Sequence, residues 1–133
     1  MIATVESAAY LGIHAYSVQV EVDVSYGLPQ FLVVGLPDQS IKESRERVRA
    51  AIKNSGFSFP PEKITINLAP ADIKKEGPAF DLPIALGILA ATGMMTPEQL
   101  SPYIFLGELA LDGSLRAFKG AVVMTSEIGR AHV

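Results

Sequence analysis

The chain has 133 residues, 49% of them hydrophobic, which fits one domain able to bury a core without covalent cross-links. It contains no cysteine, which excludes disulfides, thiolate zinc sites and thiol catalysis. Its formal net charge is −3, so any contact with nucleic acid must be local rather than driven by an overall basic excess.

The N-terminal residues lack the basic region and apolar segment of a secretory signal. The longest apolar run, residues 82–91, is shorter than the roughly 18 residues that a membrane span needs. We therefore expect a cytoplasmic protein that has no membrane partner.

The first third of the chain is predicted to form strands over residues 3–10, 15–25 and 31–35. In the second strand, valines at every other position define one face and polar residues the other. Glu21 and Asp23 on the polar face could suggest acid–base or metal chemistry. A solvated sheet face is the preferred interpretation, because no histidine or further acid converges from nearby sequence.

A helix is predicted over residues 39–54. Ser40 and Glu43 have the spacing of a capping box, and Gly56 is placed as a C-terminal stop.

This helix carries a basic stripe on one face. The stripe consists of Lys42, Arg45, Arg49 and Lys53. Four cations on one face could bind phosphate, so they are the candidate nucleic-acid contacts, or they could bind an acidic partner. The preferred interpretation is an ordinary salt-bridged surface, because Glu43 and Glu46 are close enough in sequence to pair with them.

Apolar and polar residues alternate over 64–68, which predicts a half-buried strand before the loop 74–81, and an apolar helix follows over 82–91. Asp81 is predicted to cap this helix and Gly93 to end it. Gly87 inside the helix suggests a close approach to the sheet or to another helix.

The last third is predicted to contain a strand over 104–111, a tight turn at 112–114 and a short hairpin strand over 115–118. A further helix is expected to start near Gly120. The order β-β-β-α-β-α-β-β indicates an α/β sandwich in which helices pack on a mixed sheet.

The loop 74–81 occupies a strand-to-helix connection, where many enzymes place a nucleophile. Lys74, Lys75, Gly77 and the helix start at Asp81 could attract an anion or a partner. The competing interpretation is that two solvated lysines balance Asp72 and Glu76, and the loop only turns the chain. The two interpretations are left open.

Several catalytic devices are absent from the sequence. No phosphate-binding P-loop or dinucleotide fingerprint is present. His14 and His132 stand alone, so neither a metal site nor a Ser-His-Asp set is expected. We expect no metal and no cofactor in this chain.

Five segments, in order, resemble the N-terminal domain of the magnesium-chelatase-like ATPases of the ComM/YifB family. They are residues 1–8 (MIATVESA), 33–38 (VVGLPD), 42–52 (KESRERVRAAI), 67–72 (NLAPAD) and 75–83 (KEGPAFDLP). The similarity covers residues 1–120.

The resemblance implies the fold of the second domain of ribosomal protein S-five and of the Lon proteolytic domain. Ala79 then stands at the position of the Lon serine nucleophile, and the Lon catalytic lysine falls near Val122. Because both reactive groups are absent, the resemblance implies a domain without peptidase activity.

The resemblance further implies a parent protein in which an AAA+ motor follows this domain. Such a parent forms a ring and acts as an ATP-driven DNA motor of helicase or branch-migration type in natural transformation. ATP and magnesium would bind in the motor, and the partners of this domain would be that motor, neighbouring subunits and DNA. The alternatives are a vestigial Lon-type serine peptidase domain and a subunit of a metal-chelatase-like ATPase.

The end of the chain departs from the family pattern. Residues 127–133 read like the translation of a sequencing adapter, so we expect a non-native tail. Residues 121–126 would then be the start of a truncated helix.

Overall fold

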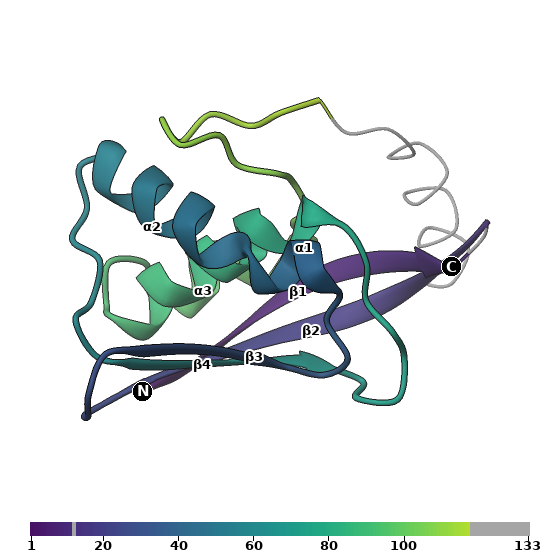
Figure 1. Cartoon of the computed structure of the whole chain (residues 1–133), viewed down its shortest axis with the longest axis horizontal. Coiled ribbons are helices and arrows are strands. Elements are labelled where there is room, and N and C mark those ends of the chain that lie inside the picture. Colours follow the sequence, from purple (N-terminus) through teal and green to yellow (C-terminus); the bar gives the residue numbers. More distant parts are fainter. Residues whose placement is uncertain (12, 118–133) are drawn as a thin grey trace.

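Four strands form one open mixed sheet in the order β1-β2-β4-β3. The structure is a computed structural model that describes residues 1–11 and 13–117 (Figure 1). The strands are β1 (Ile2–Leu11), β2 (His14–Ser25), β3 (Gln30–Val34) and β4 (Lys63–Ala69). β1 and β4 each pair antiparallel with β2, whereas β3 pairs parallel with β4. The predicted mixed sheet is confirmed.

Helices cover one face of this sheet (Figure 1). They are α1 (Gln39–Lys42), α2 (Ser44–Asn54), the 3-10 turn η1 (Pro78–Phe80), α3 (Asp81–Ala91) and α4 (Pro97–Leu100). The parallel connection from β3 to β4 runs through α1 and α2, as a crossover must. None of the helices in the described part of the chain is long and apolar enough to span a bilayer.

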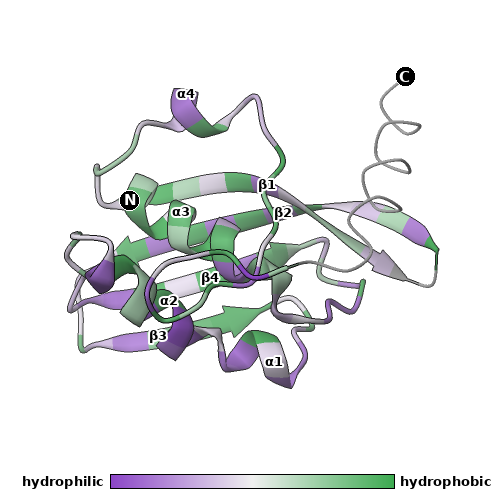
Figure 2. Cartoon of the chain, turned by 90° about the horizontal axis from the view of Figure 1, so that it is seen from above, coloured by the Kyte–Doolittle hydropathy of each residue, from purple (hydrophilic) through white to green (hydrophobic). Residues whose placement is uncertain are grey.

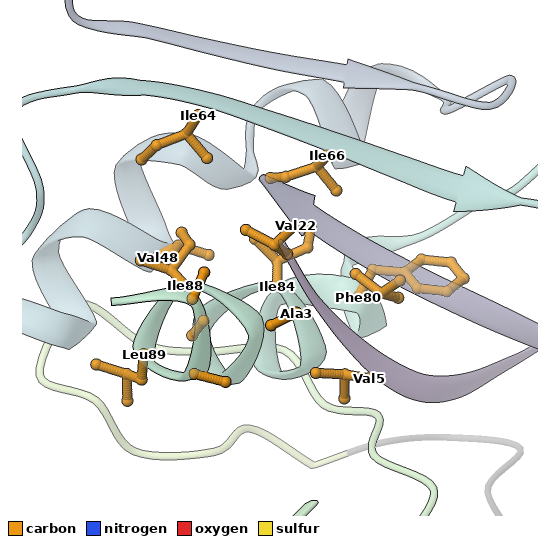
Figure 3. Close-up of a cluster of buried hydrophobic side chains, with 14 of the residues drawn as sticks. Ala3, Val5, Val22, Val48, Ile64, Ile66, Phe80, Ile84, Ile88 and Leu89 are labelled. Atoms are coloured by element: carbon orange, nitrogen blue, oxygen red, sulfur yellow. The ribbon is translucent and has the colours of Figure 1, made fainter. Parts of the chain in front are cut away.

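The core lies between the sheet and helices α2 and α3, where apolar side chains from both layers meet (Figure 3). Alternate residues of β2 and β4 point into it, and all of them are buried: Val18, Val20, Val22, Val24, Ile64, Ile66 and Leu68. The alternation of apolar and polar residues in these strands therefore predicted the inner face of the sheet correctly. Figure 2 shows green segments on the strands beneath these helices and purple on α2.

Helix α3 is buried on nearly every side and approaches the sheet closely at Gly87. A Cβ at this position would lie 2.4 Å from Cγ2 of the buried Val22, nearer than atoms can pack. The predicted close helix–sheet approach is therefore confirmed.

The predicted helix over residues 39–54 is interrupted at Glu43. Its N-cap is Asp38, whose Oδ1 accepts the backbone N–H of Ile41 at 3.0 Å and the Ser40 hydroxyl at 2.8 Å. The predicted capping box at Ser40 and Glu43 is wrong, because Asp38, two residues before Ser40, is the N-cap.

Full strands over 104–111 and 115–118 are not formed within the described residues, which include this segment up to 117. A shorter hairpin is present: Leu109 and Leu115 form an antiparallel bridge, Ala110 N–H donates to the Ser114 carbonyl at 2.8 Å, and Arg116 N–H donates to the Glu108 carbonyl at 2.9 Å. Earlier backbone groups of the segment bond to η1 and β1, since Gly107 N–H donates to the Ala79 carbonyl and Phe105 N–H to the Glu6 carbonyl. The helix expected near Gly120 and the tail over 127–133 lie outside the described residues.

Candidate functional site

The loop between β4 and α3 is held by Lys75, the second lysine of the candidate anion site. Its side chain is fully buried, and Nζ donates to the carbonyl of Gly35 at 2.8 Å and to that of Pro70. Burial lowers the pKa of this ammonium, and the nearby Asp72 opposes that shift. The prediction of a solvated Lys75 is wrong, because the ammonium joins the ends of β3 and β4 instead of facing water.

The backbone of the same loop pairs with the segment that follows β3. Lys75 N–H donates to the Leu36 carbonyl at 2.9 Å, and Asp38 N–H donates to the Lys75 carbonyl at 3.0 Å. Gly35 permits this approach: its φ is +102°, and a Cβ there would lie 2.2 Å from the Leu68 carbonyl oxygen. The segment after β3 and the loop at Lys75, which are far apart in sequence, are thus joined by backbone hydrogen bonds at one junction.

Asp38 ties this junction to the start of α1. Its Oδ2 accepts Gly77 N–H at 2.9 Å, while Oδ1 caps α1. Burial alone would raise the pKa of Asp38, but hydrogen bonds from Gly77, Ile41 and Ser40, with the charge of Lys74, hold that pKa below its ordinary value. Gly77 is therefore engaged by an internal carboxylate.

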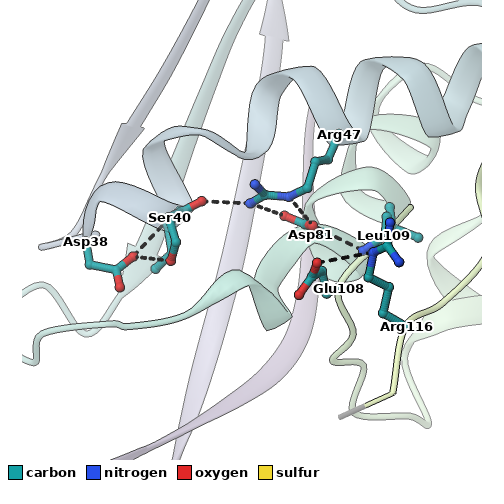
Figure 4. Close-up of polar contacts among 8 residues, drawn as sticks. Asp38, Ser40, Arg47, Asp81, Glu108, Leu109 and Arg116 are labelled. Atoms are coloured by element: carbon teal, nitrogen blue, oxygen red, sulfur yellow. Dashed lines mark hydrogen bonds and ion pairs between the residues drawn. The ribbon is translucent and has the colours of Figure 1, made fainter. Parts of the chain in front are cut away.

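Asp81 joins α2, α3 and the segment at Leu109 (Figure 4). Arg47 Nε donates to Oδ2 at 2.7 Å and Nη2 to Oδ1 at 3.1 Å, while Leu109 N–H reaches Oδ2 at 3.1 Å. The hydrogen bond to Asp81 raises the pKa of Arg47, and burial raises that of Asp81 against the opposing effect of Arg47. Asp81 is the first residue of α3 rather than its cap, so the predicted cap is wrong.

We call Lys75, Asp38, Asp81 and Arg47 the loop clamp. Each of these charged groups finds hydrogen-bond partners inside the domain, so none of them presents a free charge to a ligand. Lys74 is the remaining candidate of the predicted anion site. It is exposed, and its Nζ lies 3.8 Å from a Glu76 carboxylate oxygen.

A pocket of about 340 Å³ opens beside the clamp, next to Ala79. Its lining residues are Ala8, Ala9, Tyr10, Asp38, Glu76, Gly77, Pro78, Ala79 and Phe80. Among these there is no serine, threonine, cysteine, lysine or histidine, so the part of the lining that the structure describes offers neither an aliphatic hydroxyl or thiol nucleophile nor a basic amine or imidazole.

Three of the four cations of the predicted basic stripe line a second pocket, of about 290 Å³. Arg45, Arg49 and Lys53 of α2 face Pro29 and the 59–61 segment, Phe59, Pro60 and Pro61. We call this pocket the α2 groove. Lys42 does not line it, since Lys42 ends α1 and the helix is interrupted after it.

The expected pairing of these cations with Glu43 and Glu46 is not found. Over residues 1–11 and 13–117, the ion pairs within 4.0 Å involve the N-terminus, Arg47, Lys74 and Arg116. Glu46 shares a neighbouring hollow with Arg49 and Lys53 without reaching either. The salt-bridged interpretation is wrong for the described residues.

Sequence reasoning missed Arg47 as an organising residue, and it placed Asp38 at the opening of the first helix without its contact to Gly77. A signal for Arg47 was present, since on a helix it lies between Ser44 and Ala51, both of which are buried. A cation on the buried side of a helix requires an acidic partner. The described residues contain no group of three or more His, Cys, Asp or Glu side chains placed to hold a metal ion.

Comparison with known proteins gives consistent matches. The family described as subunit ChlI of Mg-chelatase matches residues 20–133. The chain is 51% identical over 130 residues to protein YifB of Salmonella typhimurium, covering 98% of this chain and 26% of that protein. It is 50% identical over 126 residues to protein YifB of Escherichia coli, covering 95% of this chain and 25% of that protein.

A third relative carries a functional name. The chain is 48% identical over 121 residues to competence protein ComM of Haemophilus influenzae, covering 91% of this chain and 24% of that protein. The chain therefore spans about a quarter of the length of these relatives.

Proposed function

This chain belongs to the magnesium-chelatase-like family that includes YifB and ComM, and we propose that it is a non-catalytic N-terminal domain of an ATP-driven motor that processes DNA. The motor would lie in the remainder of a longer protein. It would bind ATP and magnesium, and this domain would contact it and neighbouring subunits of a ring in the cytoplasm.

The observation that carries the non-catalytic assignment is the pocket beside Ala79. Ala79 lies in the 3-10 turn η1 just before α3, lines that pocket and is 8% exposed. A Ser-Lys mechanism needs a hydroxyl and a base within hydrogen-bond reach, and the described residues of the lining include neither a serine nor a lysine. This argues against peptidase activity in this domain.

Two observations support the DNA-processing part of the proposal. One relative is named a competence protein. The second is the α2 groove, in which three cations are free of ion pairs among the described residues. A domain of net charge −3 can contact DNA only through such a local surface.

The first experiment incubates the 133-residue chain with casein, with fluorogenic peptides and with ATP. We expect no turnover of any of them. Peptide cleavage that is lost in Lys75→Ala would contradict the non-catalytic assignment, provided that circular dichroism shows the variant to be folded.

The second experiment reads the gene beyond codon 126. The proposal expects a P-loop ATPase in frame downstream, and its absence would contradict the proposed motor function. A role in metal insertion is the competing proposal, favoured by the family description. It expects the longer protein to insert magnesium into a tetrapyrrole when ATP is supplied, whereas our proposal expects ATP hydrolysis stimulated by DNA.

A further inference from the structure

We propose that the α2 groove binds the sugar–phosphate backbone of single-stranded DNA. This inference rests on the proposed function in one respect: a motor that processes DNA would expose single-stranded DNA to this domain. The binding surface itself is argued from the geometry and charge of the groove.

The cations of the groove form one row, inclined by about 26° to the helix axis. Arg45, Arg49 and Lys53 are spaced i, i+4 and i+8 within one unbroken helix, α2. Each step therefore advances about 6 Å along the axis, and the row is about 12 Å long. Such steps are comparable with the separation of neighbouring phosphates along an extended strand, so the row can meet consecutive phosphates of one strand.

The charges of the row are available to a ligand. All three side chains belong to exposed residues, and none forms an ion pair within the described ranges, 1–11 and 13–117. Arg47, on the same helix, differs in donating to both Asp81 and the Ser40 carbonyl. An unpaired guanidinium suits phosphate, because its planar fork can donate two hydrogen bonds to one anion.

The opposite wall of the groove is rigid and apolar. Pro29 stands at the turn before β3, and Phe59, Pro60 and Pro61 belong to the connector that descends from α2 to the sheet (Figure 1). Proline rings restrict the backbone, so the wall loses little conformational freedom when a ligand binds. A basic row facing an apolar wall resembles the general design of single-strand grooves, in which cations follow the backbone and the wall contacts sugars and bases.

A single strand fits this surface better than a duplex. The cations form one row along one wall of the groove, whereas a duplex presents two strands that need cations spread over a broader surface. The rest of the chain is acidic on balance, because the net charge of −3 already includes the three cations of the row, so a second strand of phosphates would be repelled on average.

The test measures binding of a fluorescein-labelled oligothymidylate to the 133-residue chain by anisotropy as the salt concentration is varied. Contact with three phosphates predicts that the logarithm of the affinity falls with the logarithm of salt at a slope of about −2. The triple variant R45Q/R49Q/K53Q should bind at least about tenfold more weakly at low salt and lose most of that slope.

The matched control removes three charges elsewhere, in K42Q/K63Q/K74Q. Lys42 ends α1, Lys63 starts β4, and Lys74 lies on the loop, all outside the groove. We expect this variant to retain the slope of the original chain. Thermal unfolding of both triple variants checks that each is folded.

Four outcomes would overturn the proposal. Equal losses in the two triple variants would indicate a general charge effect without a site. Equal affinity for duplex and single strand would remove the single-strand assignment, and tighter binding of poly-glutamate would assign the groove to an acidic protein partner. If the chain binds no oligonucleotide although a P-loop is encoded downstream, this inference fails while the proposed function stands.

Discussion

The loop clamp and the α2 groove both contain cations, but those cations differ in their partners. In the clamp, Lys75 donates to the carbonyls of Gly35 and Pro70, and Arg47 donates to a buried carboxylate. In the groove, Arg45, Arg49 and Lys53 have no ion-pair partner in the part of the chain that the structure describes. The same residue types thus hold the fold together in one region and face solvent in the other.

This difference shows which region can bind a ligand. A buried charge whose donors are already occupied would have to break internal hydrogen bonds before it could bind an anion. An exposed and unpaired charge gives up only its hydration. The loop, whose two interpretations the sequence left open, holds its cations through internal contacts, so the helix surface is the better candidate for binding an anion.

Among the substitutions that test the difference between the two regions, the largest effect on stability is expected at Asp81. Asp81→Asn removes the charge that Arg47 and the Leu109 N–H share, so the unfolding free energy should fall by about 3 kcal/mol. Urea unfolding measures this. Asp72→Asn, an exposed aspartate in the same loop region, should cost little, and an equal loss in the two variants would contradict the assigned role of Asp81.

Lys75 provides the second test. Lys75→Met keeps most of the volume but leaves two carbonyls without their donor, so we expect a loss of about 2 kcal/mol in unfolding free energy. Lys74→Met, at the exposed neighbour, should change it by less than about 0.5 kcal/mol. Oligonucleotide affinity measured on folded Lys75→Met should be unchanged, because Lys75 does not face the groove.

Asp38 provides a test that depends on pH. Asp38→Ala should cost about 1 kcal/mol at neutral pH through loss of the helix cap and the Gly77 contact. The pKa of Asp38 in the folded chain lies below its ordinary value of 3.8, so its carboxylate stabilises the fold above that value. The stability is lost as pH falls through the lowered pKa.

The difference between the original chain and Asp38→Ala should therefore shrink as urea titrations move from neutral pH to below the lowered pKa. A difference that stays constant over that range would show that the charge of Asp38 contributes nothing.

The smallest effect on stability is expected in the groove. Arg49→Gln should change the unfolding free energy by less than about 0.5 kcal/mol, because Arg49 is exposed and unpaired in the described residues. It should lower the salt slope for oligothymidylate by about 0.7. A stability loss comparable with that of Asp81→Asn would erase the distinction between the two regions.

Much of the fold could be predicted from local patterns. Alternating valines located the inner face of β2, and the continuous apolar run located α3, because both patterns follow the geometry of a single element. Of the hairpin predicted over residues 104–118, the described residues form only the part near the turn, because N–H groups earlier in the segment, at Phe105 and Gly107, bond to β1 and to η1. A turn signal reveals nothing about such competing partners.

The candidate site was less predictable for the same reason. The stripe on α2 could be read from helical spacing, although the break at Glu43 separated Lys42 from it. The burial of Lys75 could not be predicted from the sequence. Its partner carbonyls belong to Gly35 and Pro70, and only the folded chain brings Gly35 close to the loop.

The sequence by itself determined the mixed α/β architecture, the inner faces of β2 and β4, the family and the alanine at position 79. These depend on local periodicity and on residue identity, which are present in the chain before it folds. Only the tertiary structure decided which cations are free and which are internal. Hydrogen bonds reach about 3 Å, so the partner of a charged group depends on which distant segments the fold brings beside it.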